Sequence, residues 1–218
     1  MRLFSPVRVI TLGNKLKERF APRRFTLLFH QINDEGKWVF LNGPTHTLCY
    51  CHVFKALYER KFNAPMLWNS NFFITLESMK ILRVLTDVWL PDFKFGPGRC
   101  AMVLAKTPWY WETVTRNLGL IAEWGEDYSI HHLVMPNHVQ CCTYPVLEWI
   151  AEHVPAAPVN VMAQFHPDNF CDPASAKYRN RYAEIARRPS RAELNNSWRH
   201  ARELGLKFET STFERCNA

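Results

Sequence analysis

Two charged residues, Asp92 and Lys94, follow a short predicted strand at positions 87–91 and precede the turn Gly96-Pro97-Gly98. Residues two apart on an extended chain point to the same side, so the carboxylate and the ammonium lie close together. Charged groups at the end of a buried strand are costly unless they pair or bind a ligand. In parallel α/β folds ligands bind at that end of the strands. The pair therefore indicates either a ligand site or an ion pair that merely closes a loop.

Polar residues follow other predicted strands in the same way. Strand patterns near 37–41, 65–68, 128–135 and 159–163 alternate with helical patterns, which predicts an α/β fold with a parallel sheet and right-handed crossovers. The polar residues at the strand ends are Thr45 and His46, Asn69 to Asn71, His131 and His138, and Gln164 and His166. Because the carboxyl ends of parallel strands meet at one edge, we expect these side chains to line a rim that binds a polar small molecule.

Capping signals predict where several helices begin and end. Thr75 precedes a short apolar-striped segment, Thr107-Pro108 precedes a longer one, and Ser190-Arg-Ala-Glu193 is a capping box that opens a last helix before Gly205. Helices are also predicted from Pro145 to His153 and from Tyr178 to Arg188.

Composition narrows the class of protein. The formal net charge of the 218 residues is +7, but seven basic residues against Glu18 place +6 of it in residues 1–24. We therefore expect a basic, disordered tail at 1–24, one folded unit at 25–210 and a C-terminal tail at 211–218, with no nucleic-acid partner for the nearly neutral body.

No apolar run is long enough for a bilayer, so no membrane partner is expected. The odd count of seven cysteines without a signal peptide favours a reducing cytoplasm.

The cysteines raise one metal-binding possibility. His46, Cys49 and His52 share one face of a predicted helix, with Cys51 nearby, which is compatible with a soft-metal site. The alternative is a helix whose buried thiols pack on the sheet. The pair Cys141-Cys142 is interpreted as packing at a helix start, and Cys171 as a loop thiol without an indicated partner.

Five stretches together resemble the radical S-adenosylmethionine proteins related to pyruvate formate-lyase activating enzyme. They are Gly43-Pro-Thr-His46, Trp68-Asn-Ser-Asn71, Val88-Trp-Leu-Pro-Asp-Phe-Lys94, His132-Leu-Val-Met-Pro136 and Asn160-Val-Met-Ala-Gln-Phe-His-Pro167. The resemblance runs from about residue 25 to residue 207. It implies a partial, open (β/α) TIM-like barrel whose first strand is missing, and two cofactors, S-adenosylmethionine and a [4Fe-4S] cluster.

The resemblance also implies roles for individual residues. Lys94 would bind the carboxylate of S-adenosylmethionine, while Asp92 and Asn69 would form the adjoining polar or cation site. His166 would lie against the adenine, and Gln164 follows the same predicted strand as His166. His131 stands where the family usually has an arginine. The cofactor-binding residues implied are Pro44, Thr45, Asn69, Asp92, Lys94, His131, Gln164 and His166; no catalytic residue and no metal ligand is assigned.

One family feature is absent from these 218 residues. The family holds its cluster with a Cys-x-x-x-Cys-x-x-Cys loop, in which each thiolate binds one iron and the fourth iron stays open for the cofactor. The sequence contains no such motif. We therefore expect a truncated member that does not hold a cluster alone, with a protein substrate or a complementary subunit that supplies the cluster loop as its partner. The alternative is a catalytically inactive barrel that acts as a nucleoside-binding or scaffold module, or half of a split enzyme.

Overall fold

The computed structural model describes residues 39–42 and 66–209. The predicted tails at 1–24 and 211–218 lie outside the described residues. So do the implied cofactor residues Pro44 and Thr45, and the predicted metal-binding helix with Cys49.

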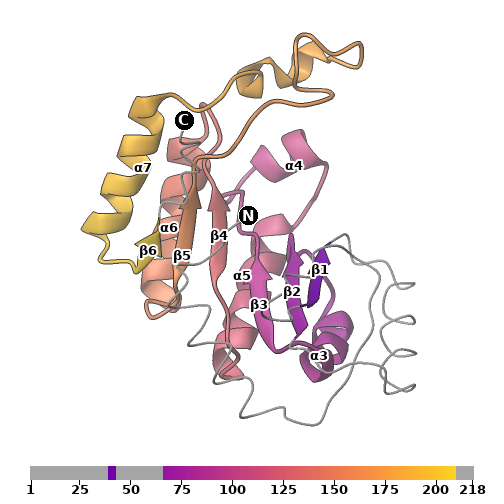
Figure 1. Cartoon of the computed structure of the whole chain (residues 1–218), viewed down its shortest axis with the longest axis vertical. Helices are drawn as coiled ribbons and strands as arrows, with labels where there is room; N and C mark the ends of the chain where they lie inside the picture. Colours follow the sequence, from indigo (N-terminus) through magenta and orange to yellow (C-terminus); the bar gives the residue numbers. More distant parts are fainter. Residues whose placement is uncertain (1–38, 43–65, 210–218) are drawn as a thin grey trace, which may run out of the picture.

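Parallel strands form the centre of the described part (Figure 1). One sheet has the order β1 (Val39–Asn42), β2 (Met66–Ser70), β3 (Val88–Pro91). The other has the order β4 (Ile130–Leu133), β5 (Val159–Met162), β6 (Phe208–Glu209). Parallel bridges from Trp89 to Tyr128 and from Asp92 to His131 place β4 beside β3. The predicted parallel α/β architecture is therefore confirmed, and closure into a partial barrel stays a prediction.

Helices connect these strands. In chain order they are α3 (Leu76–Leu85), α4 (Cys100–Ala105), α5 (Tyr110–Glu123), the π-helical segment η1 (Val139–Thr143) that runs into α6 (Tyr144–His153), the 3₁₀-helix η2 (Asn180–Ile185) and α7 (Arg191–Glu203). None of the helices in the described ranges is long and apolar enough to cross a bilayer.

Two predicted helix starts are confirmed by their hydrogen bonds. The Oγ1 atom of Thr75 accepts from the backbone N–H of Ser78 at 3.3 Å. Ser190 and Glu193 form both halves of the capping box that opens α7. The sequence signals were sufficient to predict both helix starts, because a cap depends only on residues within one turn.

Other local predictions were wrong. Helix α5 begins at Tyr110 behind the left-handed residue Trp109, because the Thr107 hydroxyl instead donates to the carbonyl of Ala101 in α4. The short α4 itself was not predicted. The helix predicted from Tyr178 to Arg188 is only the 3₁₀ segment η2, whose buried residues, Tyr182 and Ile185, have the three-residue spacing of that helix type. The strand predicted at 128–135 shortens to β4.

The core surrounds β3 and β5, in which every residue is buried. Trp89 on β3 packs edge-on against Phe72, with ring centroids 5.7 Å apart. The buried Asn117 of α5 donates from Nδ2 to the carbonyls of Phe72 and Ile74, both at 2.9 Å. This packing holds the loop after β2, and with it the carboxyl edge of the strands, against α5.

Candidate functional site

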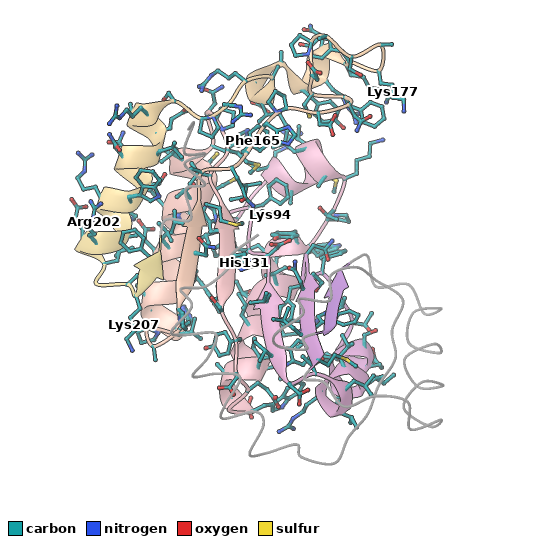
Figure 2. The ribbon with its side chains drawn as sticks, in the orientation of Figure 1. Lys94, His131, Phe165, Lys177, Arg202 and Lys207 are labelled. Atoms are coloured by element: carbon teal, nitrogen blue, oxygen red, sulfur yellow. The ribbon has the colours of Figure 1, made fainter. Side chains whose placement is uncertain are left out.

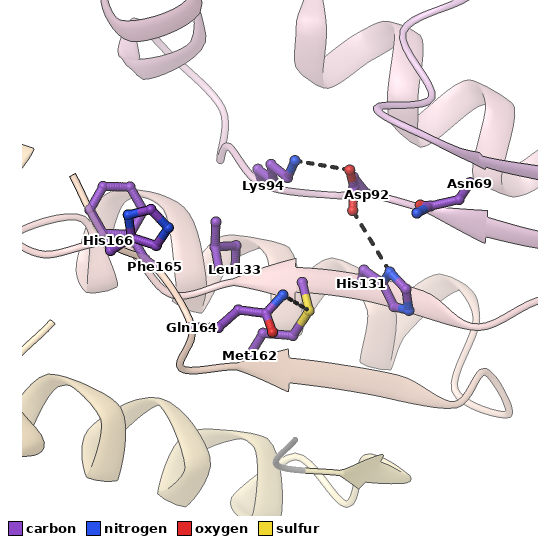
Figure 3. A pocket seen from close by; sticks show the side chains of 9 residues that line it. All are labelled: Asn69, Asp92, Lys94, His131, Leu133, Met162, Gln164, Phe165 and His166. Atoms are coloured by element: carbon purple, nitrogen blue, oxygen red, sulfur yellow. Dashed lines mark hydrogen bonds and ion pairs between the residues drawn. The ribbon is translucent and has the colours of Figure 1, made fainter. Parts of the chain in front are cut away.

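A cavity of about 410 Å³ lies at the carboxyl ends of the parallel strands (Figure 3). Its volume is in the range of small-molecule sites. The residues that line it are Asn69, Asp92, Lys94, His131, Leu133, Met162, Gln164, Phe165 and His166. Figure 2 shows Lys94 and His131 in the middle of the molecule, Phe165 beyond the strand ends near α4, and Lys177 and Lys207 at the periphery. All six implied cofactor residues within the described ranges therefore converge on one cavity.

Asp92 is the centre of the charged wall of this cavity. Its Oδ2 atom lies 2.9 Å from Nζ of Lys94, and its Oδ1 atom lies 3.8 Å from Nδ1 of His131 (Figure 3). The Lys94 side chain keeps 32% of its surface exposed, against 18% for Asp92. The ammonium is therefore paired and still accessible to a ligand that enters the cavity.

The backbone of residues 92–94 is held by hydrogen bonds from both neighbouring strands and from α5. Asp92 donates its N–H to the carbonyl of Ser70, and Phe93 donates to the carbonyl of His131. The phenol of Tyr110, at the start of α5, accepts from the N–H of Lys94 at 3.0 Å and donates to the carbonyl of Asp92 at 3.1 Å. Burial raises the pKa of Tyr110, so this hydroxyl stays protonated and fills both roles. The charged pair is thus held on a rigid segment, as a binding site requires.

His131 contributes a neutral ring to the cavity. Its side chain is buried, and burial lowers the pKa of the imidazole more than the nearby Asp92 raises it. Its Nε2 atom has no hydrogen-bond partner among the described residues. His131 therefore adds no positive charge to the lining at neutral pH, whereas the Lys94 ammonium does.

The sequence did not indicate the apolar part of the cavity. Leu133 and Met162 are register partners at the ends of β4 and β5, and Phe165 follows β5. A local signal existed, since Met162 lies two residues before Gln164, but apolar residues at strand ends usually belong to the core. The cavity thus has a charged wall and an apolar wall.

A second group of functional side chains lies outside the cavity. Cys100, His138, Cys141 and Cys142 bring one ligand atom each to within 4.8 Å of one another. The interpretation of Cys141-Cys142 as simple packing missed this group. Burial is the largest cause that raises the pKa of the Cys142 thiol.

The described residues do not fit a [4Fe-4S] cluster at the cavity. None of the residues that line it is a cysteine. The three thiols of the second group lie too close together for a cluster in which each thiolate binds a different iron. The only other cysteine in the described ranges, Cys171, belongs to neither group.

The fold and the cavity define an α/β protein with a candidate ligand site at the carboxyl edge of its parallel strands. No protein-family model matches the chain. An uncharacterized protein of Methanocaldococcus jannaschii is 34% identical over 187 residues, which cover 86% of this chain and 52% of the relative. The chain thus spans about half the length of this curated relative.

The fold has a solved counterpart. A domain of a pyruvate-formate lyase-activating enzyme from Bacteroides vulgatus superposes with a TM-score of 0.56 and 13% sequence identity. The match covers 80% of this chain and 98% of that domain. The two therefore share a fold.

Proposed function

We propose that this chain is a radical S-adenosylmethionine-type protein, related to pyruvate formate-lyase activating enzyme, whose cavity binds S-adenosylmethionine. The observation that carries the proposal is the accessible Asp92–Lys94 pair at the edge of a 410 Å³ cavity that also has an apolar wall. The shared fold supports it, and so does the resemblance of the quoted sequence stretches, which implies that these residues bind the cofactor.

Different residues of the cavity bind different groups of the ligand. The Lys94 ammonium, a compact point charge, binds the α-carboxylate, and the Asp92 carboxylate binds the α-amino group. Phe165 and His166 provide flat rings for the adenine, and Leu133 and Met162 provide an apolar wall.

Radical chemistry would depend on a cluster-binding loop that these 218 residues do not contain. Beside a reduced [4Fe-4S] cluster, S-adenosylmethionine supplies a 5′-deoxyadenosyl radical, but the described residues do not fit that cluster. We therefore assign this chain the binding and orientation of the cofactor, and assign the cluster loop to a complementary subunit. On this proposal the chain alone acts as a nucleoside-binding module.

Isothermal titration of the full chain tests the binding site. We expect S-adenosylmethionine to bind the wild type, and Lys94→Gln to weaken that binding about 10- to 100-fold, the loss of one charge-assisted hydrogen bond. Adenosine, which lacks the carboxylate, should bind both proteins equally. Lys177→Gln, at an exposed lysine far from the cavity, is the matched control. Wild-type protein that does not bind S-adenosylmethionine would disprove the proposal.

Reconstitution of the chain with iron and sulfide tests the assignment of the cluster to a partner. We expect no [4Fe-4S] absorption and no reductive cleavage of S-adenosylmethionine, because the three-cysteine loop is absent from the sequence. About four irons per chain together with cleavage activity would show that the chain holds its own cluster.

A further inference from the structure

We propose that Cys100, His138, Cys141 and Cys142 form a mononuclear zinc site, separate from the cavity that binds S-adenosylmethionine. Three thiolates and one imidazole are a common ligand set of structural zinc. The site is independent of the proposed function, because none of its four residues lines the cavity.

The distances within the group match a single tetrahedral ion. Bonds of about 2.3 Å to sulfur and about 2.0 Å to nitrogen keep the ligand atoms of tetrahedral zinc about 3.5–3.8 Å apart. The Sγ atom of Cys141 lies 3.6 Å from Sγ of Cys100, 3.9 Å from Sγ of Cys142 and 3.3 Å from Nδ1 of His138. Cys142 Sγ lies 3.9 Å from the same nitrogen. The other two pairs of ligand atoms lie within 4.8 Å of each other, so all four atoms are close enough together to bind one ion.

The second ring nitrogen of His138 supports a metal-binding role. Its Nε2 atom is buried, has no hydrogen bond within the described ranges, and lies 3.6 Å from a carboxylate oxygen of Glu184. Histidines that bind metals usually direct their other nitrogen to a carboxylate, which fixes the tautomer and raises ligand basicity. Nδ1 is thereby left to face the sulfurs.

The loop that carries His138 is firmly anchored. The preceding Asn137, in a left-handed conformation, donates its N–H to Oε1 of Glu193 at 2.6 Å and its Nδ2–H to the carbonyl of Glu184. Arg187 binds both Glu193 oxygens, at 2.8 and 3.0 Å, and the Asn137 side chain at 2.8 Å. These protein–protein hydrogen bonds hold the loop in position without a metal ion.

The π-helical segment η1 explains how two adjacent cysteines serve one site. Its wider turn lets the N–H groups of both Cys142 and Thr143 donate to the carbonyl of His138. His138, Cys141 and Cys142 thus face one point, and such segments are frequent at functional sites. Cys100, at the start of α4, adds the ligand that comes from a distant part of the chain.

The ligand set favours zinc over hard metal ions. Soft thiolates with one imidazole in tetrahedral arrangement suit zinc, and hard ions such as Mg²⁺ prefer oxygen. Four protein ligands leave no open position, which is typical of a structural site. The ion would join α4 to the start of α6, and would require the three thiols to release their protons.

Metal analysis of the full chain, purified under reducing conditions, tests the site. We expect about one zinc per chain in the wild type and a loss of at least ten-fold in Cys100→Ser and Cys141→Ser. Cys171→Ser is the matched control and should keep the wild-type zinc content, because Cys171 lies outside the group. Zinc well below one equivalent in the wild type, or equal loss in Cys171→Ser, would overturn the proposal.

Cobalt substitution of the wild type gives a readout that does not depend on how the variants fold. Apo protein titrated with Co²⁺ should show the ligand-field bands of tetrahedral cobalt and a thiolate-to-cobalt charge-transfer band, both saturating at about one equivalent. His138→Gln should weaken the ligand-field bands and keep the thiolate band. An octahedral cobalt spectrum, or no binding, would refute a tetrahedral thiolate site.

Discussion

Two adjacent histidines on β4 have different tasks. His131 faces the cavity beside Asp92. His132 points to the opposite side and is fully buried, with Nδ1 2.7 Å from the carbonyl of Phe93 and Nε2 2.9 Å from the hydroxyl of Thr143. Since a carbonyl only accepts, Nδ1 carries the proton and Nε2 accepts from Thr143. His132 is therefore a neutral structural link between the segment after β3 and η1.

This role of His132 predicts a pH-dependent stability. Burial lowers the pKa of His132 to about 4, below the value of about 6.5 expected in the unfolded chain. Between these two pH values the unfolded state therefore binds more protons than the folded state. The contribution of neutral His132 to the stability of the fold is complete above pH 6.5 and is lost as the pH falls through about 4. The shift corresponds to stability on the order of 3 kcal/mol.

Thermal unfolding from pH 7 to pH 4 measures this contribution. We expect the melting temperature to fall with pH, and His132→Gln to be less stable at pH 7 with a shallower fall. His153→Gln, whose ring is half exposed on α6, is the control and should keep the wild-type slope. An unchanged slope in His132→Gln would mean that this histidine is not held neutral in the fold.

Among the elements, the segment after β3 makes a close backbone contact with η1 that helps to position the site. A Cβ atom on Gly96 would lie 2.1 Å from the carbonyl oxygen of Cys141, so only glycine fits. This contact brings the segment that carries Lys94 against the helix that carries Cys141 and Cys142. The cavity and the cysteine group thus share one structural support.

Gly96→Ala should therefore destabilise the protein, by roughly 3 kcal/mol, because two backbone segments must separate. Gly119→Ala is a matched control: its Cβ atom meets nothing within 4 Å, and alanine in the interior of α5 should stabilise by about 0.5–1 kcal/mol. Urea denaturation of the three proteins measures both effects. Equal stability of Gly96→Ala and wild type would show that the two segments are free to move apart.

Across the whole molecule, the candidate site joins the two sheets. Asn69 lies on β2 and Asp92 follows β3, whereas His131 lies on β4 and Gln164 follows β5. Within the described residues, β3 and β4 are connected through two isolated bridges rather than a continuous ladder. A ligand in the cavity therefore contacts both halves and should stabilise them together.

A thermal shift follows from this arrangement. S-adenosylmethionine at about 100 times its dissociation constant should stabilise the folded state by about 2.7 kcal/mol, which raises the melting temperature of a chain of this size by about 5–10 °C. Lys94→Gln should show a much smaller shift at the same concentration. An identical shift in both proteins would place the ligand elsewhere.

The sequence by itself determined the parallel α/β order, two helix caps and the polar residues at the strand ends, because strand alternation and capping depend on near neighbours. It also indicated that Asn69, Asp92, Lys94, His131, Gln164 and His166 share an edge, since parallel strands end on the same side. The implied roles of these residues toward a cofactor stay predictions, as do those of Pro44 and Thr45.

Only the tertiary structure decided which side chains meet across long distances in the sequence. Cys100 and Cys141 come together because α4 folds back on the start of α6, and no periodic pattern spans the sequence separation of 41 positions between them. Adjacent His131 and His132 differ because a strand sends successive side chains to opposite faces, while packing alone decides which face holds the cavity. The apolar wall of Leu133 and Met162 likewise depends on strand register, which long-range pairing sets.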